Sequence, residues 1–258
     1  MSMLELRDVR AGFGATTVLQ GCSFGVSESG VGAVLGLNGA GKTVALKVAA
    51  GIVPAWSGGV WFDGVDVTKL AAETRVRMGM GHVPQGRQVF AGLSVEENLR
   101  LGSYVLRRRD RPRYPAVLET MLDRFPILAQ RRRQVAGKLS GGQQTLLAVA
   151  RALMSEPRLL LVDEASAGLS PDAVQQLFEI LREVNRSGVT VLLVEQNVTF
   201  TLRVADRVHL MQRGRIVYEG DARSIDVQRV GEYLGVGRLL GKGLPASPPG
   251  EGNDASRD

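Results

Sequence analysis

Short apolar runs separated by glycine-rich turns open the chain. Two such runs, Leu4–Arg10 and Val18–Val26, flank Gly12-Phe13-Gly14, so they predict two β-strands joined at that turn. A third run, Gly32–Leu37, is bounded by glycine and predicts a buried strand. The helical stretch Thr43–Ala50 follows closely, so we expect a strand that leads into a helix.

The second half of the chain alternates between strand-like and helix-like segments. Apolar runs at Leu159–Asp163 and Thr190–Glu195 predict strands, while Pro171–Asn185 and Phe200–Ala205 predict helices. Such alternation is typical of βαβ units with parallel strands. The region from about Val95 to Ala152 is mostly helical. We therefore predict an α/β protein whose three-layer core carries an N-terminal antiparallel β element and a helical insertion.

The domain organisation follows from length and composition. The 258 residues are enough for one large domain with a sizeable core, and the sequence contains no internal repeat. Residues 241–258 are rich in glycine, proline, serine and charge, which predicts a disordered tail. We therefore predict one domain over residues 1–240, with the helical insertion at about 95–152, followed by that tail.

Arginine gives the chain its net charge of +6 and its pI near 9.9. The arginines gather in two clusters, Arg107-Arg108-Arg109-Asp110-Arg111 with Arg113, and Arg131-Arg132-Arg133. Such clusters form either a solvated helical face or a surface that attracts nucleic acid or anionic lipid. Aromatic residues are not interleaved as base-stacking platforms require, so nucleic acid is not indicated. The role of the clusters stays open.

Cysteine content and hydropathy predict the compartment. Cys22 is the single cysteine, so no internal disulfide forms, which suits a reducing environment. The first residues, Met1–Leu6, lack the basic flank and apolar stretch of a signal peptide. Every apolar run is far shorter than the roughly 20 residues of a membrane span. We therefore expect a soluble, cytoplasmic chain.

Two glycine pairs resemble the start of a dinucleotide-binding fingerprint, in Gly12-Phe13-Gly14 and in Gly30-Val31-Gly32. Neither is followed by the third glycine that lets a helix pack closely against the strand. A nicotinamide site is therefore excluded.

A stronger motif lies between the buried strand and the helix that follows it. Eight consecutive residues fit G-x-x-x-x-G-K-[ST]: Gly36, Leu37, Asn38, Gly39, Ala40, Gly41, Lys42 and Thr43. The glycines let the backbone curl around phosphates and aim its N–H groups at them. Lys42 would place a cation on the β- and γ-phosphates, and the Thr43 hydroxyl would ligate Mg²⁺. The motif predicts an ATP-type phosphate site.

Two carboxylates complete the chemistry that such a loop needs. Asp163 and Glu164 follow the apolar run Leu159–Val162. Asp163, at the end of the strand, would hold Mg²⁺ through water, and Glu164 would polarise the attacking water as general base. Together the two motifs predict a P-loop nucleoside triphosphatase.

A third motif, Leu139-Ser140-Gly141-Gly142-Gln143-Gln144, lies upstream of the carboxylates. Ser140, Gly141 and Gly142 would open a helix whose N-terminal N–H groups and dipole form a second anion site. The motif resembles the signature of the ATP-binding cassette family. The resemblance implies that this second site serves the γ-phosphate of a partner ATPase subunit in a head-to-tail dimer.

Other family positions match in order. The resemblance implies that Phe13 stacks on adenine, although a turn aromatic in a small core would look the same in sequence. It implies that Gln85 contacts Mg²⁺ and the attacking water, in a loop that abuts the membrane subunit. Ala167–Pro171 lies where the family has a dimer-contact loop. Gln196 stands where most relatives carry a switch histidine, and Val44 stands where they usually place a serine or threonine. His82 and His209 are expected to be structural.

Three stretches of sequence narrow the resemblance to one subgroup of the family. Val83–Phe90, Leu93–Leu99 and Val194–Asn197 resemble the second ATPase subunit of importers for branched-chain amino acids and of their urea- and amide-importing relatives, and the likeness covers residues 3–237. It implies ATP hydrolysis with Mg²⁺, a second ATPase subunit in a heterodimer or homodimer, two permease subunits and, indirectly, a solute-binding protein. The expected place is the cytoplasmic face of the membrane. An exporter ATPase and a soluble, non-transport cassette remain alternatives.

Overall fold

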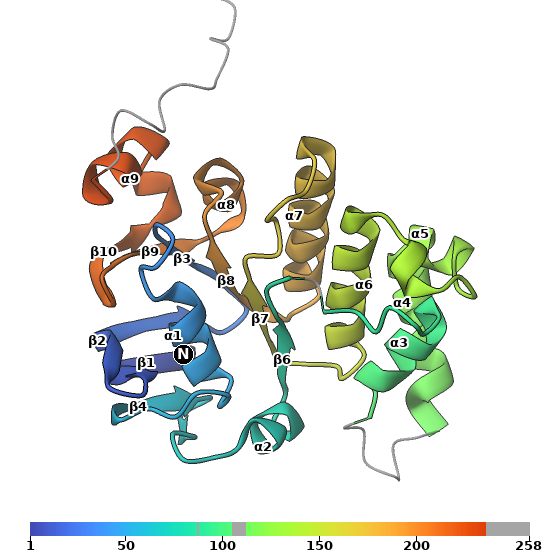
Figure 1. Ribbon diagram of the computed structural model, residues 1–258, viewed down its shortest axis with the longest axis horizontal. Coiled ribbons are helices and arrows are strands. Elements are labelled where there is room, and N and C mark those ends of the chain that lie inside the picture. The colour runs from blue at the N-terminus through green and yellow to red at the C-terminus, as the bar shows by residue number, and fades with distance from the viewer. Residues whose placement is uncertain (87, 105–111, 236–258) are drawn as a thin grey trace, which may run out of the picture.

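The computed structural model describes residues 1–86, 88–104 and 112–235. The predicted tail, residues 241–258, therefore lies outside the described residues, and so does most of the first arginine cluster, at 105–111. Among the described residues, no helix is long and apolar enough to cross a membrane. Figure 1 shows a small sheet, one helix, a larger sheet and a set of outer helices packed against one another.

The smaller sheet is antiparallel, as predicted. Its strands run in the order β2-β1-β4-β5. Their bounds are β1 Ser2–Phe13, β2 Thr16–Ser27, β4 Ser57–Phe62 and β5 Val65–Asp66. The predicted turn is placed too early, because Phe13 still pairs with Thr16 as the last residue of β1. Gly14, with a φ of 54°, takes the corner instead.

The larger sheet has six strands in the order β10-β9-β3-β8-β7-β6. All neighbouring strands are parallel except β10, which is antiparallel to β9, so the prediction of parallel βαβ units is confirmed. The strands are β3 Val31–Leu35, β6 Met80–Val83, β7 Leu159–Asp163, β8 Thr190–Glu195, β9 Arg207–Gln212 and β10 Arg215–Asp221. The helices of this part are α1 Lys42–Ala49, α2 Ala72–Arg77, α7 Pro171–Arg186, α8 Val198–Val204 and α9 Val227–Tyr233.

The parallel strands are buried on both faces, which explains their continuous apolar runs. On β7, Leu161 belongs to the core shared with α1 and the small sheet, while Val162 belongs to the core under the outer helices. On β8, Val194 faces the α1 core and Leu193 faces the outer helices. Side chains alternate between the two faces along a strand. The last residue of β7 therefore lies on the same face as Leu161, and the last residue of β8 lies on the same face as Leu193.

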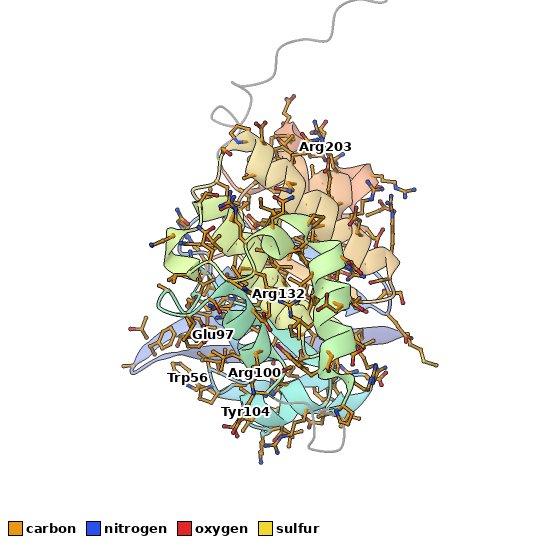
Figure 2. The ribbon with its side chains drawn as sticks, turned by 90° about the vertical axis from the view of Figure 1, so that its right-hand side faces the viewer. Trp56, Glu97, Arg100, Tyr104, Arg132 and Arg203 are labelled. Carbon is orange, nitrogen blue, oxygen red and sulfur yellow. The ribbon has the colours of Figure 1, made fainter. Side chains whose placement is uncertain are left out.

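The helical insertion packs beside the larger sheet, at the edge formed by β6 (Figure 1). Its elements are α3 Val95–Gly102, α4 Tyr114–Arg124, α5 Pro126–Gln130, the 3₁₀ turn η2 Ala136–Lys138 and α6 Gly141–Leu153. Arg132, from the second arginine cluster, binds Glu96 at 2.6 Å and Glu119 at 3.0 Å. Figure 2 shows this face, with Glu97, Arg100 and Arg132 over the insertion. Arg132 therefore joins elements of the insertion to one another.

Candidate active site

The loop between β3 and α1 is shaped to surround phosphate groups. Gly39 and Gly41 adopt φ angles of 79° and 107°, in the left-handed region where a side chain is strained. A Cβ atom at Gly36 would lie 2.5 Å from the carbonyl oxygen of Met211, so a side chain is excluded there too. The loop ends at the first turn of α1, whose backbone N–H groups have no intrahelical partner and attract anions.

The predicted phosphate-binding cation and the predicted general base contact each other. Lys42 Nζ lies 2.9 Å from Glu164 Oε1, and the two side chains are only 3% and 7% exposed. Lys42 Nζ also donates to the carbonyl oxygens of Gly36 and Leu37, at 3.0 and 3.2 Å. A buried charge is costly unless it is paired, so this ion pair fixes the position of both side chains.

Asp163 and Thr43 form the second contact between the two motifs. The Thr43 hydroxyl donates to Asp163 Oδ1 at 2.9 Å. Strand alternation places Asp163 on the α1 face of β7, because Leu161 faces the same way. Its other oxygen, Oδ2, is buried without a hydrogen-bond partner among the described residues. Burial raises the pKa of the Asp163 carboxyl, and the Thr43 hydrogen bond opposes that rise.

These oxygens fit a magnesium ion. A desolvated carboxylate with an unused oxygen beside a hydroxyl is the hard-oxygen donor set that Mg²⁺ prefers. Among the described residues, no three His, Cys, Asp or Glu side chains converge as a metal cage. A site with few protein ligands, completed by phosphates and water, is the usual arrangement for Mg²⁺ with a nucleotide.

Two glutamines donate to Glu164 from opposite sides. Gln85 Nε2 lies 2.7 Å from Glu164 Oε2, and Gln196 Nε2 lies 3.0 Å from Oε1. Gln196 Nε2 also contacts Asn38 Oδ1 in the phosphate loop. The structure therefore brings the three residues predicted to be catalytic into one hydrogen-bonded group around Glu164.

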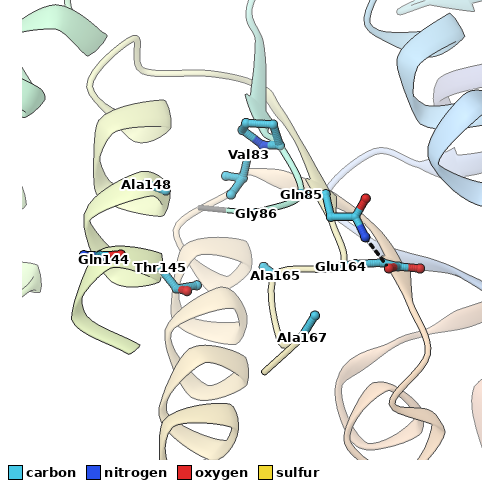
Figure 3. Close-up of a pocket in the computed structure, with 10 residues that line it drawn as sticks. Val83, Gln85, Gly86, Gln144, Thr145, Ala148, Glu164, Ala165 and Ala167 are labelled. Atoms are coloured by element: carbon cyan, nitrogen blue, oxygen red, sulfur yellow. Dashed lines mark hydrogen bonds between the residues drawn. The ribbon is translucent and has the colours of Figure 1, made fainter. Parts of the chain in front are cut away.

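A pocket of about 600 Å³ lies next to this group. Figure 3 shows Gln85 reaching Glu164 on one side of the pocket and Gln144 and Thr145 on α6 across from them. The full lining is Val83, Pro84, Gln85, Gly86, Gln144, Thr145, Ala148, Glu164, Ala165 and Ala167. The pocket thus lies between α6 of the insertion and the residues that follow β6 and β7, beside the candidate base.

The signature residues open α6, as the sequence predicts. Ser140 is the N-cap, its hydroxyl accepts from the Gln143 backbone N–H at 3.3 Å, and the Gln143 side chain accepts from Ser140 N. Gly142 is crowded, since a Cβ atom there would lie 3.0 Å from Ala173 Cβ. Figure 1 shows α6, which the signature opens, on the other side of β6 from α1, the helix that follows the phosphate loop.

Phe13 and Val44 lie in opposite environments. Phe13 is 56% exposed at the end of β1, so its ring is available to a ligand rather than part of a small core. Val44 is buried in the core between α1 and the sheets. Ala40, also in the phosphate loop, belongs to the same core. The phosphate loop is therefore packed, through Ala40, against the core beside α1.

Both histidines lie within the larger sheet. Burial lowers the pKa of His82 to about 4. His209 is fully buried, and its Nε2 lies 3.0 Å from the carbonyl oxygen of Gly25. Within the described part of the chain, neither ring is hydrogen-bonded to the residues around Glu164.

Sequence reasoning missed two buried polar side chains, one that binds the residues after β7 and one at the C-terminal end of α1. Glu195, at the end of β8, is bound by Ser166, and a carboxylate that ends an apolar strand is the signal that points to it. Arg75 donates to the carbonyl oxygens of Val48 and Ala49 at the end of α1, at 2.8 and 2.7 Å. It therefore binds carbonyl groups at the C-terminal end of the helix that carries Lys42.

Comparison with known proteins identifies the chain. The ABC transporter family matches residues 19–167, which include the phosphate loop, the signature and both carboxylates. The chain belongs to the ABC transporter family. It is similar to the high-affinity branched-chain amino acid transport ATP-binding protein BraG of Pseudomonas aeruginosa, with 41% identity over 83% of this chain and 91% of that protein. It is 35% identical to the probable branched-chain amino acid transport ATP-binding protein LivF of Archaeoglobus fulgidus, over 86% and 94% of the two chains.

The solved structures agree with this assignment. An ATP-binding cassette of an ABC transporter in its ADP conformation superposes with a TM-score of 0.78 and 27% identity, over 91% of this chain and 95% of that one. The predicted α/β cassette fold is confirmed. As a member of the ABC transporter family, this chain is an ATP hydrolase.

Proposed function

We propose that this chain powers an ABC importer for branched-chain amino acids or a related small polar solute such as urea or amides. The relatives BraG and LivF, which it matches over most of its length, are named for branched-chain amino acid transport. The observation that carries the ATPase role is the convergence of Lys42, Gln85 and Gln196 on Glu164, beside Asp163 and Thr43.

The proposed chemistry follows from this geometry. The phosphate loop and Lys42 bind the phosphates of ATP, and the exposed Phe13 stacks on the adenine. Thr43, Asp163 and Gln85 would hold Mg²⁺, which neutralises phosphate charge when bound. Glu164 accepts a proton from the attacking water, and Gln85 and Gln196 keep its carboxylate oriented. Because both side chains are neutral amides, they position Glu164 and do not themselves accept the proton from water.

The assembly is proposed on the same basis. Ser140, Gly141 and Gly142 open α6, which lies on the other side of β6 from α1, so in a head-to-tail dimer they would serve the γ-phosphate bound by the other subunit. That subunit is either a second copy or a related ATPase. The dimer would work at the cytoplasmic face of the membrane with two permease subunits and a solute-binding protein.

Co-purification followed by transport tests the proposal. The tagged chain should recover permease subunits, and proteoliposomes that enclose ATP and Mg²⁺ and carry the complex with its ATPase face inside should take up labelled leucine or urea when solute-binding protein is added outside. Solute movement in the reverse direction would identify an exporter. Failure to pellet with membranes that contain the permease would favour a soluble cassette.

Phe90 is the side chain we expect to transmit hydrolysis to the permease. The sequence suggests an apolar patch at Val89, Phe90 and Leu93, but only the Phe90 ring is exposed, at 52%. Its backbone is held by the buried Asn98, which binds Phe90 N at 2.8 Å and Phe90 O at 3.0 Å. Because the loop is fixed and presents an exposed aromatic ring, it is suited to pack against a helix of a permease subunit.

Phe90→Ala should therefore lower ATP-driven uptake about five-fold while basal ATP hydrolysis stays near normal. Both quantities are measured in the same proteoliposomes. Val65→Ala, which removes an equally exposed apolar side chain from β5, is the matched control. Equal loss of uptake and hydrolysis with a lowered Tm would show that Phe90 supports folding instead.

Val44 lacks the hydroxyl that relatives usually place near the α-phosphate. One hydrogen bond contributes about 0.5–1.5 kcal/mol net, so Val44→Thr should tighten ATP binding several-fold. Threonine has nearly the same shape, which limits disturbance of the α1 core. Calorimetric titration with ATP measures the change, and unchanged or weaker affinity would mean that a backbone N–H or water already fills this role.

A further inference from the structure

Glu195 is a buried carboxylate at the end of β8, 2% exposed. It accepts two hydrogen bonds from Ser166 and one from the backbone N–H of Gln196. Oε1 lies 3.1 Å from the Ser166 backbone N–H nitrogen, and Oε2 lies 2.6 Å from its hydroxyl. Strand alternation places Glu195 on the face under the outer helices, because Leu193 faces the same way.

The residues on either side of Glu195 bind Glu164, which lies two residues before Ser166. The backbone N–H of Glu164 donates to the Val194 carbonyl oxygen at 2.8 Å, and Gln196 donates to the Glu164 side chain at 3.0 Å. Three consecutive residues at the end of β8 thus bind the two residues that flank Ala165.

Glu164 needs such support. Its φ is 43°, a left-handed conformation that a residue with a Cβ atom adopts only where the surroundings hold it. The backbone hydrogen bond to Val194 holds Glu164 on its N-terminal side, and the Glu195–Ser166 contact holds the chain two residues later. The loop that follows, Ala167–Pro171, therefore starts from a fixed point.

We propose that Glu195 is a positioning residue for hydrolysis: through Ser166 it keeps Glu164 in its left-handed conformation and aims its carboxylate. This proposal rests on the assignment of Glu164 as the general base. ATP binding depends on the phosphate loop and Lys42, to which Glu195 makes no hydrogen bond or ion pair among the described residues, so loss of the Glu195–Ser166 contact lowers kcat and leaves the KM for ATP nearly unchanged.

Four variants of the full chain, in the complex in which it is isolated, test the proposal. Burial raises the pKa of the Glu195 carboxyl, so glutamine, the isostere of the protonated form, is tolerated there and can keep both contacts with Ser166. Glu195→Met has a similar length but no polar atoms that replace the carboxylate. Ser166→Ala removes the hydroxyl alone. Thr190→Val is the control, because it removes a buried acceptor for Ser29 N from the other end of the same strand.

We expect Glu195→Met to lower kcat about ten-fold, Ser166→Ala about three-fold, and Glu195→Gln and Thr190→Val less than two-fold. The kcat of the double variant Glu195→Met/Ser166→Ala should equal that of Glu195→Met, because both changes break the same Glu195–Ser166 contact. The Tm of each variant, measured in parallel, separates a loss of folding from a loss of positioning.

Three results would overturn the proposal: near-normal kcat in Glu195→Met, multiplicative effects in the double variant, or an equal fall in kcat for Thr190→Val at a similar Tm. Glu164→Gln in the same series separates the two assignments. If it is inactive while Glu195→Met is normal, only the role of Glu195 is wrong. If Glu164→Gln itself turns over normally, the base has been misassigned.

Discussion

Glu164→Gln should lower ATP hydrolysis by roughly 10²–10⁴-fold while ATP binding persists, because glutamine cannot accept the proton of the attacking water. The structure adds a second expectation. In the wild type, Glu164 forms a buried ion pair with Lys42, 2.9 Å away. The neutral glutamine frees Lys42 to bind phosphate, so affinity for ATP should be equal to or greater than that of the wild type.

The comparison with Lys42→Ala makes this prediction specific. That variant removes the phosphate-binding cation and leaves Glu164 buried without its counter-charge. It should bind ATP weakly and unfold more easily, since breaking a buried pair typically costs about 3–5 kcal/mol.

Steady-state turnover, ATP titration and size-exclusion chromatography with ATP and Mg²⁺ distinguish these outcomes. Glu164→Gln should bind ATP, fail to turn over and accumulate as an ATP-bound dimer. Near-normal turnover in Glu164→Gln would remove this residue from the role of base.

The local sequence pattern was sufficient to predict the parallel strands and the phosphate loop. Leu159–Asp163 and Thr190–Glu195 are strands with the predicted bounds, because both of their faces are buried and their apolar runs are continuous. The β1–β2 turn was harder to place. Its corner depends on the φ of Gly14 and on the pairing of Phe13 with Thr16, and a stretch with glycine at 12 and 14 permits either corner.

The polar contacts around Glu164 required the order of the strands. Glu195 and Ser166 are 29 residues apart in sequence, and they meet because β7 and β8 are adjacent and parallel, so their ends lie together. The sequence predicts parallel strands but not which strands are neighbours. For the same reason it did not reveal that Gln85 and Gln196, on either side of Glu164, bind the same carboxylate.

Gln196 stands where the family resemblance places a switch histidine, and Gln196→Ala should lower hydrolysis by roughly 10–10²-fold. Its amide donates to Glu164 Oε1 at 3.0 Å and contacts Asn38 in the phosphate loop. It therefore links the base to the loop that holds the phosphates. The loss should be smaller than in Glu164→Gln, because a positioning contact is removed and the base remains.

Gln196→His should retain activity and acquire a new pH dependence. Glutamine does not titrate near neutrality, whereas an unperturbed histidine has a pKa of about 6.5. A protonated imidazole beside Glu164 would pair with the carboxylate and compete with its role as base, so kcat should fall as the pH drops from about 7.5 to 5.5. A profile with the same shape as the wild type would show that residue 196 does not act on Glu164.

A dimer with one disabled site decides whether the site built on this chain turns over at all. The alternative is that it binds ATP and leaves hydrolysis to the partner's site, with Gln196 marking a regulatory position. If the phosphate-loop lysine of the partner subunit is changed to alanine, only the site that contains Lys42, Asp163 and Glu164 can hydrolyse ATP. Because Lys42 pairs with Glu164, and Asp163 accepts a hydrogen bond from Thr43, we expect single-site turnover that Glu164→Gln abolishes. A half-disabled dimer that hydrolyses nothing would show that this site is regulatory and that Glu164 is not the working base.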